Sequence, residues 1–289
     1  MTRRAWKYCR RPRLVAGGVA ALAAVIVTAC ATFGSHAQAR DGVRTPVTPP
    51  MKNHPLDEVW SGKRYASETA RALHDAREEN PANGVVADGT LLWRRVVGSA
   101  GKSCASCHND PAFSMRSAGT RYPKYFSGWQ RPITLEDRIN RCRDVHMRAE
   151  RWPRGARSLI AMTTFVRSQS RRQPVRPAYD GRMQPFVASG RKSFVQRIGL
   201  LGLSCQNCHG SLAGKRLGAQ TLSQGQSNAF PTYKLTLGAV SSLHQQFQRC
   251  NIRVGAEPLE LGADAYVNLE AYLAYRGVGL PVETPGVRD

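Results

Sequence analysis

The sequence predicts a mainly α-helical protein with an internal duplication, and three observations support this. The pentapeptide C-x-x-C-H occurs twice, at Cys104–His108 and Cys205–His209. One further cysteine follows each copy, Cys142 and Cys250, so that the motifs are 101 residues apart and the single cysteines 108. Apolar residues at helical spacing flank both copies in the same order. A repeated order of parts predicts two copies of one helical unit.

The C-x-x-C-H motif predicts covalently bound haem. Its two thiols add to the vinyl groups of the porphyrin, and the histidine is held under the iron as an axial ligand. A closed zinc site is disfavoured, because it needs four ligands and no second C-x-x-C or H-x-x-x-H lies near either copy. A thioredoxin-like redox motif is disfavoured by the absence of a βαβ pattern. We therefore expect two tandem cytochrome c-like domains with two haem c groups, attached through Cys104 and Cys107 and through Cys205 and Cys208, with axial His108 and His209.

The expected elements follow one another in an order that suits two such domains. Polar, proline-rich residues 40–56 predict a mobile leader, and Pro81–Gly84 predicts a break. Residues 168–180, with two prolines and three arginines, predict a linker, and 210–232 a Gly- and Gln-rich loop. Helical spacing predicts helices over 55–80, 88–97, 135–147, 159–166, 186–198, around Cys250, and over 266–276. The predicted division is a signal peptide at 1–39, an N-terminal extension at 40–83, and cytochrome c domains at 84–175 and 176–289.

The first 39 residues are typical of an export signal. A basic start is followed by an apolar run at Leu14–Ala29, which is too short to span a membrane comfortably. The small residues of Ala37–Ala39 favour cleavage after Ala39. Alternatively, Val27–Cys30 resembles a lipobox, in which Cys30 would be lipidated. Either reading predicts the periplasm, where c-type haem is attached.

The net charge is strongly positive. The whole chain carries 42 basic and 20 acidic residues, a formal charge of +22. Removal of residues 1–39 takes away six bases and no acid, which leaves 36 against 20, or +16. Export makes nucleic acid an unsuitable partner, so a small anionic substrate or an acidic redox partner fits this charge better.

The second axial ligand of each iron is left open by the residues themselves. No methionine follows Met183, so the usual thioether ligand is missing from the second half, where His244, Cys250 and Lys234 remain. In the first half Cys142, His146, Met147 and Met162 compete. The equivalent placing of Cys142 and Cys250 favours the two cysteines as ligands. An inter-domain disulfide between them is the alternative, which an oxidising compartment permits.

Several segments beyond the haem motifs resemble the SoxA subunit of the SoxAX cytochromes of bacterial thiosulfate oxidation. The resemblance runs from about residue 55 to the end of the chain. It rests on Gly101–Cys104, Arg121–Pro123, Leu135–Cys142, Leu243–His244, Ala256–Pro258 and Glu283–Pro285.

The resemblance implies an activity, partners and site residues. A SoxA-type protein pairs with a monohaem cytochrome, SoxX, and acts as an L-cysteine S-thiosulfotransferase. It joins thiosulfate oxidatively to a cysteine of the carrier SoxYZ, and two electrons leave through haem to an acceptor cytochrome c. By this resemblance Cys142 is a ligand of the first iron, and Cys250 is both a ligand of the second iron and the catalytic sulfur, which the family carries as a persulfide.

The chain departs from the family pattern around Cys250. The family has arginines where this chain has Gln245, Gln246 and Gly255. Arg253 follows Cys250 by three residues and shares its helical face, whereas Arg249 does not. We expect Arg253, with Arg249 and Gln246 as further candidates, to bind the substrate anion; both arginines could instead be ordinary surface charges. The rival functions are a thiosulfate dehydrogenase that forms tetrathionate, a dihaem electron-transfer cytochrome and, less well supported, a dihaem peroxidase.

Overall fold

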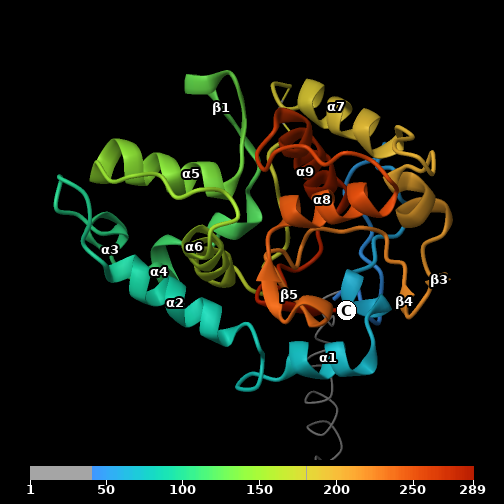
Figure 1. Ribbon diagram of the computed structural model, residues 1–289, viewed down its shortest axis with the longest axis horizontal. Coiled ribbons are helices and arrows are strands. Elements are labelled where there is room, and N and C mark those ends of the chain that lie inside the picture. The colour runs from blue at the N-terminus through green and yellow to red at the C-terminus, as the bar shows by residue number, and fades with distance from the viewer. Residues whose placement is uncertain (1–40, 180) are drawn as a thin grey trace, which may run out of the picture. The chain divides into compact units, whose positions relative to one another are not determined.

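The structure is a computed structural model that describes residues 41–179 and 181–289, and helices dominate it (Figure 1). The predicted signal peptide and Cys30 lie outside the described residues. The described residues belong to one compact unit. Its α-helices are α1 Glu68–Asp75, α2 Asn83–Arg94, α3 Cys104–His108, α4 Pro111–Ser114, α5 Leu135–Arg141, α6 Arg157–Ser168, α7 Gln184–Val195, α8 Leu243–Arg253 and α9 Asp264–Arg276.

Each half of this unit has a pair of packed helices at its centre. In the first half α2 packs against α6, and the close approach requires Gly89, where a Cβ would lie 2.4 Å from the carbonyl oxygen of Ala161. In the second half α7 packs against α9 in the same way, and a Cβ on Gly190 would lie 2.0 Å from the carbonyl oxygen of Asn268. Trp93 and Phe165 fill the first core, and Phe194 and Tyr272 fill the second.

The order of elements after these helices is also the same in both halves. Each has a haem motif, an antiparallel hairpin, a helix that carries or precedes the single cysteine, and a closing helix. The sequence-predicted mainly α character is therefore confirmed, and two internal duplicates remain the interpretation that best explains this order. The hairpins are β1 Lys124–Phe126 with β2 Arg131–Ile133, and β5 Thr232–Lys234 with β6 Ala239–Ser241. A third hairpin pairs β3 Arg216–Leu217 with β4 Gln220–Thr221, and β7 Gly286–Arg288 adds to β5 in parallel.

The segment before α2 is not the mobile leader that its composition predicts. Val47 bridges Val59, and both pack with Leu280 in a small apolar cluster. The Ser61 hydroxyl donates to Glu283 at 2.5 Å, and the buried His74 on α1 accepts from the backbone amide of Val287. Buried apolar contacts and these long-range bonds fix the segment to the end of the chain, which sequence periodicity alone cannot reveal.

Other expectations need smaller corrections. The helix expected over 55–80 is only α1, preceded by a 3₁₀ turn at Gly62–Tyr65, and the expected break at 81–84 ends where α2 begins at Asn83. The expected helix at 135–147 divides into α5 and a π-helical turn at Cys142–His146. The linker predicted at 168–180 is hydrogen-bonded to the end of the chain. The amides of Arg172 and Val175 donate to the carbonyls of Val282 and Leu280. The exact domain boundaries stay a prediction.

Within the described ranges, no helix is long and apolar enough to cross a membrane.

Candidate active site

The second haem motif is held in a capped helical turn. Ser204 caps this turn: its hydroxyl lies 3.3 Å from the amide of Asn207, whose side-chain oxygen accepts from the Ser204 amide at 2.9 Å. A π-helical turn then runs through Asn207–Ser211. The cap fixes the start of the turn, so Cys205, Cys208 and His209 all line one cavity of about 240 Å³, which is walled mostly by apolar side chains.

The ring of His209 is oriented by its surroundings. Its Nδ1 lies 2.8 Å from the backbone carbonyl oxygen of Ser223, and a carbonyl can only accept, so Nδ1 carries the proton. The other nitrogen, Nε2, is turned to the Cys250 sulfur and is the one available to a metal, which is the usual arrangement of ligating histidines. Gly225, with φ +75°, lies against the ring, and a Cβ there would approach it to 2.9 Å. Sequence reasoning missed Ser223 and Gly225, and only the glycine-rich composition of 210–232 pointed to this loop.

Cys250 faces His209 from α8 across the same cavity. The helix starts with a capping box formed by Ser242 and Gln245, and Cys250 lies two turns further on. Its sulfur is within hydrogen-bonding reach of the His209 ring. Burial raises the pKa of the Cys250 thiol, but bonds with His209 and Gln246 and the charge of Arg253 lower it, and the net pKa lies below its usual value. Imidazole and sulfur therefore converge on one point of the cavity, where both could hold a haem iron.

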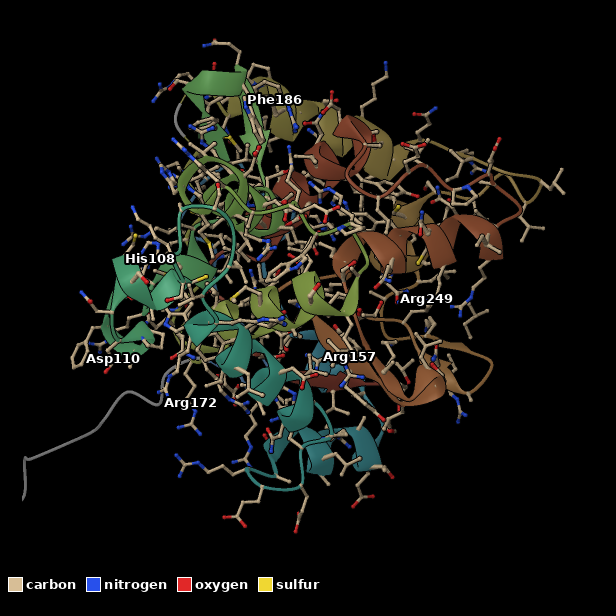
Figure 2. All side chains as sticks on the ribbon, turned by 60° about the vertical axis from the view of Figure 1, so that its left-hand side comes forward. His108, Asp110, Arg157, Arg172, Phe186 and Arg249 are labelled. Atoms are coloured by element: carbon tan, nitrogen blue, oxygen red, sulfur yellow. The ribbon has the colours of Figure 1, made fainter. Side chains whose placement is uncertain are left out.

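Gln246 and Arg249 form a short chain of hydrogen bonds that ends at this sulfur. The Gln246 amide donates from Nε2 to Cys250 Sγ at 3.4 Å. Arg249 donates to the other end of the same amide, Oε1, at 3.1 Å and to the Ser241 hydroxyl at 2.6 Å. Arg249, labelled on α8 in Figure 2, thus reaches Cys250 through Gln246 although it lies off the cysteine's helical face.

Two further arginines border the cavity differently. Arg253 is exposed and lines it, as its helical spacing from Cys250 predicts. Arg276 on α9 is buried, stacks 4.5 Å from the ring centroid of Phe194, and donates to the carbonyl oxygen of His209 at 3.3 Å. Its Nε has no protein acceptor among the described residues. Arg276 was not singled out from the sequence, because one arginine in an apolar helix gives no periodic signal.

The other ligands considered for the second iron have other partners. His244 is buried away from this cavity, accepts at Nδ1 from the amide of Gly262, and lies 3.1 Å from Glu270. Lys234 lines the cavity, but its ammonium donates to the backbone carbonyl of Asp289. Burial lowers the pKa of Lys234 to about 8, and Arg288 and Arg249 add to this effect.

The first motif is more open. It forms α3, capped by a reciprocal pair of bonds between Ser103 and Ser106, and Cys107 is exposed. Trp93 lies 5.8 Å from the ring of His108, which is labelled in Figure 2. Burial is the main cause that raises the pKa of Cys104, and the nearby Cys142 raises it further. Burial raises the pKa of Cys142 as well, and Arg138 and Arg141 offset this only in part, in contrast to Cys250.

The cysteines do not form the alternative inter-domain disulfide. All six cysteines of the described part of the chain are unpaired, and Cys142 and Cys250 each lie beside their own motif. Met162 is fully buried in the first core and Met147 is buried nearby, whereas His146 is exposed. The first site therefore brings Cys142 together with its motif as the sequence predicts.

These residues fit a covalently bound haem. The unpaired thiols would form the thioether bonds, and Nε2 of His209 would be an iron ligand. The apolar cavity would surround the porphyrin, and the unmatched Nε of Arg276 would offer a cation to a propionate. The fold and the site together define a c-type cytochrome with a cysteine beside each haem motif.

Comparison with known proteins identifies the family. The SoxA/TsdA cytochrome c domain matches residues 88–175 and 189–282. The chain is 40% identical over 239 residues to the L-cysteine S-thiosulfotransferase subunit SoxA of Pseudaminobacter salicylatoxidans, covering 82% of this chain and 84% of the relative. It is 36% identical to the corresponding subunit of Rhodovulum sulfidophilum, with 81% and 82% covered. The crystal structure of SoxXA from P. pantotrophus superimposes with a TM-score of 0.78 at 34% identity, covering 81% and 88%.

The chain belongs to the SoxA/TsdA cytochrome c family, and its most similar relatives include SoxA subunits. Its cofactors are the c-type haem groups that this family binds covalently. The resemblance found in the sequence is thereby confirmed.

Proposed function

We propose that this protein, together with a SoxX-type monohaem cytochrome, is a haem-dependent L-cysteine S-thiosulfotransferase of the periplasm. It joins thiosulfate to a cysteine of a SoxYZ-type carrier and passes electrons to an acceptor cytochrome c. The observation that carries this proposal is the place of Cys250. It lies in the cavity of the second motif, opposite His209, with an amide and a guanidinium beside its sulfur.

The overall reaction balances as a two-electron oxidation. Thiosulfate and the carrier thiol form a new S–S bond, the thiol proton is released, and two electrons leave. Bound haem would supply the redox chemistry, as an acceptor of single electrons.

The side chains of the site supply orientation and charge. Gln246 donates a hydrogen bond to Cys250 Sγ and thereby stabilises negative charge on sulfur. Arg253 places a cation at the cavity wall, where it can bind the sulfonate end of thiosulfate. Apolar neighbours such as Phe194, Leu269 and Leu273 limit the access of water to the reacting sulfur atoms.

Replacement of the two single cysteines tests the assignment. We expect Cys250→Ser to lower the rate of carrier conjugation by at least about 1,000-fold, because a reacting sulfur is removed. Intact mass should still show two haems. The matched control is Cys142→Ser, which should keep at least about a tenth of the activity, since it changes only the first site.

Two results would contradict the proposal. One is full activity in Cys250→Ser. The other is formation of tetrathionate from thiosulfate alone, with no dependence on a carrier, which would instead assign a thiosulfate dehydrogenase. Thiolate ligation itself is measured by electron paramagnetic resonance of the wild type and the two variants.

A further inference from the structure

The loop that precedes each haem motif has the same backbone in both halves. In the first half Val97 bridges Lys102, and in the second Ile198 bridges Leu203, with the same 3.0 Å hydrogen bond. Each loop has two glycines at positive φ, one at the start and one at the end: Gly98 and Gly101, and Gly199 and Gly202.

Both loops also form the same backbone hydrogen bonds with the chain that follows the single cysteine. The amides of Ser99 and Ala100 donate to the carbonyls of Arg148 and Met147. The amides of Leu200 and Leu201 donate to the carbonyls of Gly255 and Val254. Ser99 and Ala100 are therefore the structural equivalents of Leu200 and Leu201.

The side chains at these equivalent positions differ greatly. Leu200 is 92% exposed and Leu201 is 62% exposed, whereas the first loop has Ser99 and Ala100. The first loop shows that serine and alanine satisfy the fold. Leu200 and Leu201 contribute little to the core. Their apolar surface is exposed to water, which is unfavourable, and it does not stabilise the loop.

The second loop, and the end of α8 next to the carbonyls that it bonds, carry further exposed side chains. We call the Leu200–Leu201 face the set Leu200, Leu201, Ile252, Arg197 and Arg253. Ile252 is 62% exposed on α8, and both arginines are exposed. Arg197 donates to the carbonyl of Gly202, which fixes its guanidinium beside the loop. An apolar centre with a cationic rim is the composition of a protein-docking surface.

The two rim cations have no counterpart at the equivalent positions of the first half, although Lys102 and Arg148 are exposed beside the first loop. The haem motifs are 101 residues apart, and at that spacing Val96 stands where the second half has Arg197. The carbonyls that accept from the two loops are 107 residues apart, and at that spacing His146 stands where the second half has Arg253.

The Leu200–Leu201 face is continuous with the cavity that contains Cys250. Ile198 and Leu203, which close the loop, both line that cavity, and Arg253 belongs to the cavity and to the face. A protein that delivers a thiol to Cys250 past Ile198, Leu203 and Arg253 approaches next to this face.

We propose that the Leu200–Leu201 face docks the protein that carries the acceptor cysteine, through an apolar contact surrounded by acidic side chains of that partner. The inference rests on the proposed function and gives it a docking surface. The basic rim and the excess of basic over acidic residues in the chain complement an acidic partner.

The size of the face favours a partner that must leave after each turnover. Permanent subunit interfaces bury on the order of 1,000 Å² or more on each side and are broadly apolar. Three exposed apolar side chains cover only a few hundred Å², which suits a transient contact steered by charge.

The double variant Leu200→Ser/Leu201→Ala tests the proposal, since it copies the side chains that the first loop already has. In the assembled haem-containing complex we expect the KM for the carrier to rise at least about tenfold, with kcat and the KM for thiosulfate unchanged. Ser99→Leu is the matched control and should leave the KM for the carrier unchanged. Arg197→Ala should reduce the dependence of that KM on salt concentration.

Three outcomes are distinguishable. Failure of the wild type to conjugate thiosulfate to the carrier would reject the proposed function itself. A carrier KM that stays the same in the double variant, while the wild type is active, would overturn the docking surface alone. Loss of the monohaem cytochrome from the complex on size exclusion, with normal carrier KM once reassembled, would assign the face to that cytochrome and overturn the proposal.

Discussion

Gln246 lies between the guanidinium of Arg249 and the sulfur of Cys250, and these neighbours fix which end of its amide points to each. Arg249 can only donate, so the amide end that it meets is Oε1, and Nε2 is turned to Cys250. Arg249 therefore acts on the Cys250 sulfur by orienting another side chain. The charge of Arg253, by contrast, acts directly at the cavity.

The variant Gln246→Glu separates the hydrogen bond from the shape of the side chain. A carboxylate still accepts from Arg249, but it offers no N–H to the sulfur and repels both thiolate and thiosulfate. We expect carrier conjugation to fall at least about tenfold, which corresponds to about 1.4 kcal/mol, with haem content unchanged. Gln184→Glu, the same change at an exposed position of α7, is the control. Equal activity in the two variants would show that the amide does not act on Cys250.

At the residue scale the sequence predicted the groups with unusual chemistry and missed those that orient them. Two C-x-x-C-H motifs and two single cysteines are rare enough to stand out. Ser223 contributes only a backbone carbonyl to His209, and any residue could supply it. Arg249 was expected to lie off the face of Cys250, which is correct, but its path through Gln246 depends on side-chain directions that spacing does not give.

At the element scale, the loops before the haem motifs depend on one glycine more than on the other. A Cβ on Gly199 would lie 2.3 Å from the carbonyl oxygen of Val254, whereas a Cβ on Gly202 would meet nothing within 4 Å. Both glycines have positive φ, so alanine strains the backbone at either position. Only at Gly199 does it also displace the chain that follows Cys250.

Alanine at each glycine measures this difference. The left-handed conformation costs alanine about 1–2 kcal/mol at both positions. Gly199→Ala adds overpacking of about 1–3 kcal/mol, because backbone atoms must move. Urea unfolding of the haem-containing protein should therefore show Gly199→Ala as the less stable variant by about 1–3 kcal/mol. Equal stability of the two would mean that the loop is not seated against Val254 in solution.

Elements with strong helical periodicity were predicted well, and short or long-range elements were not. α6 and α9 lie where apolar spacing placed them. The three-residue strands were not predicted. A strand such as β7 forms only through its pairing with β5, more than 50 residues away in the sequence. The π-helical turn at Cys142–His146 likewise depends on one extra residue that periodicity does not register.

At the scale of the whole molecule, a buried group of charges joins the two halves. Arg154 pairs with Glu136 at 3.0 Å and with Asp137 at 2.5 Å, and both carboxylates are largely shielded from solvent. Burial raises the pKa of Glu136, and Arg154 opposes that rise. The Arg154 side chain also lies against Gly262 of the second half, where an added Cβ would be 2.2 Å from Arg154 Nε. The sequence could not predict this junction, since each charge taken alone resembles a surface charge.

Arg154→Ala therefore removes a cation from two largely shielded carboxylates and a contact between the halves. Leaving such charges unpaired costs about 3–5 kcal/mol, so we expect a loss of stability of that order. Arg157→Ala is the control: Arg157, labelled in Figure 2, pairs with Asp88 at 2.7 Å, but its side chain is 81% exposed, so its loss should cost no more than about 1 kcal/mol. Because Arg154 also connects the halves, urea unfolding followed at both haems should separate into two transitions in Arg154→Ala and remain single in Arg157→Ala. A single transition and a loss below about 1 kcal/mol in Arg154→Ala would show that apolar packing alone holds the halves together.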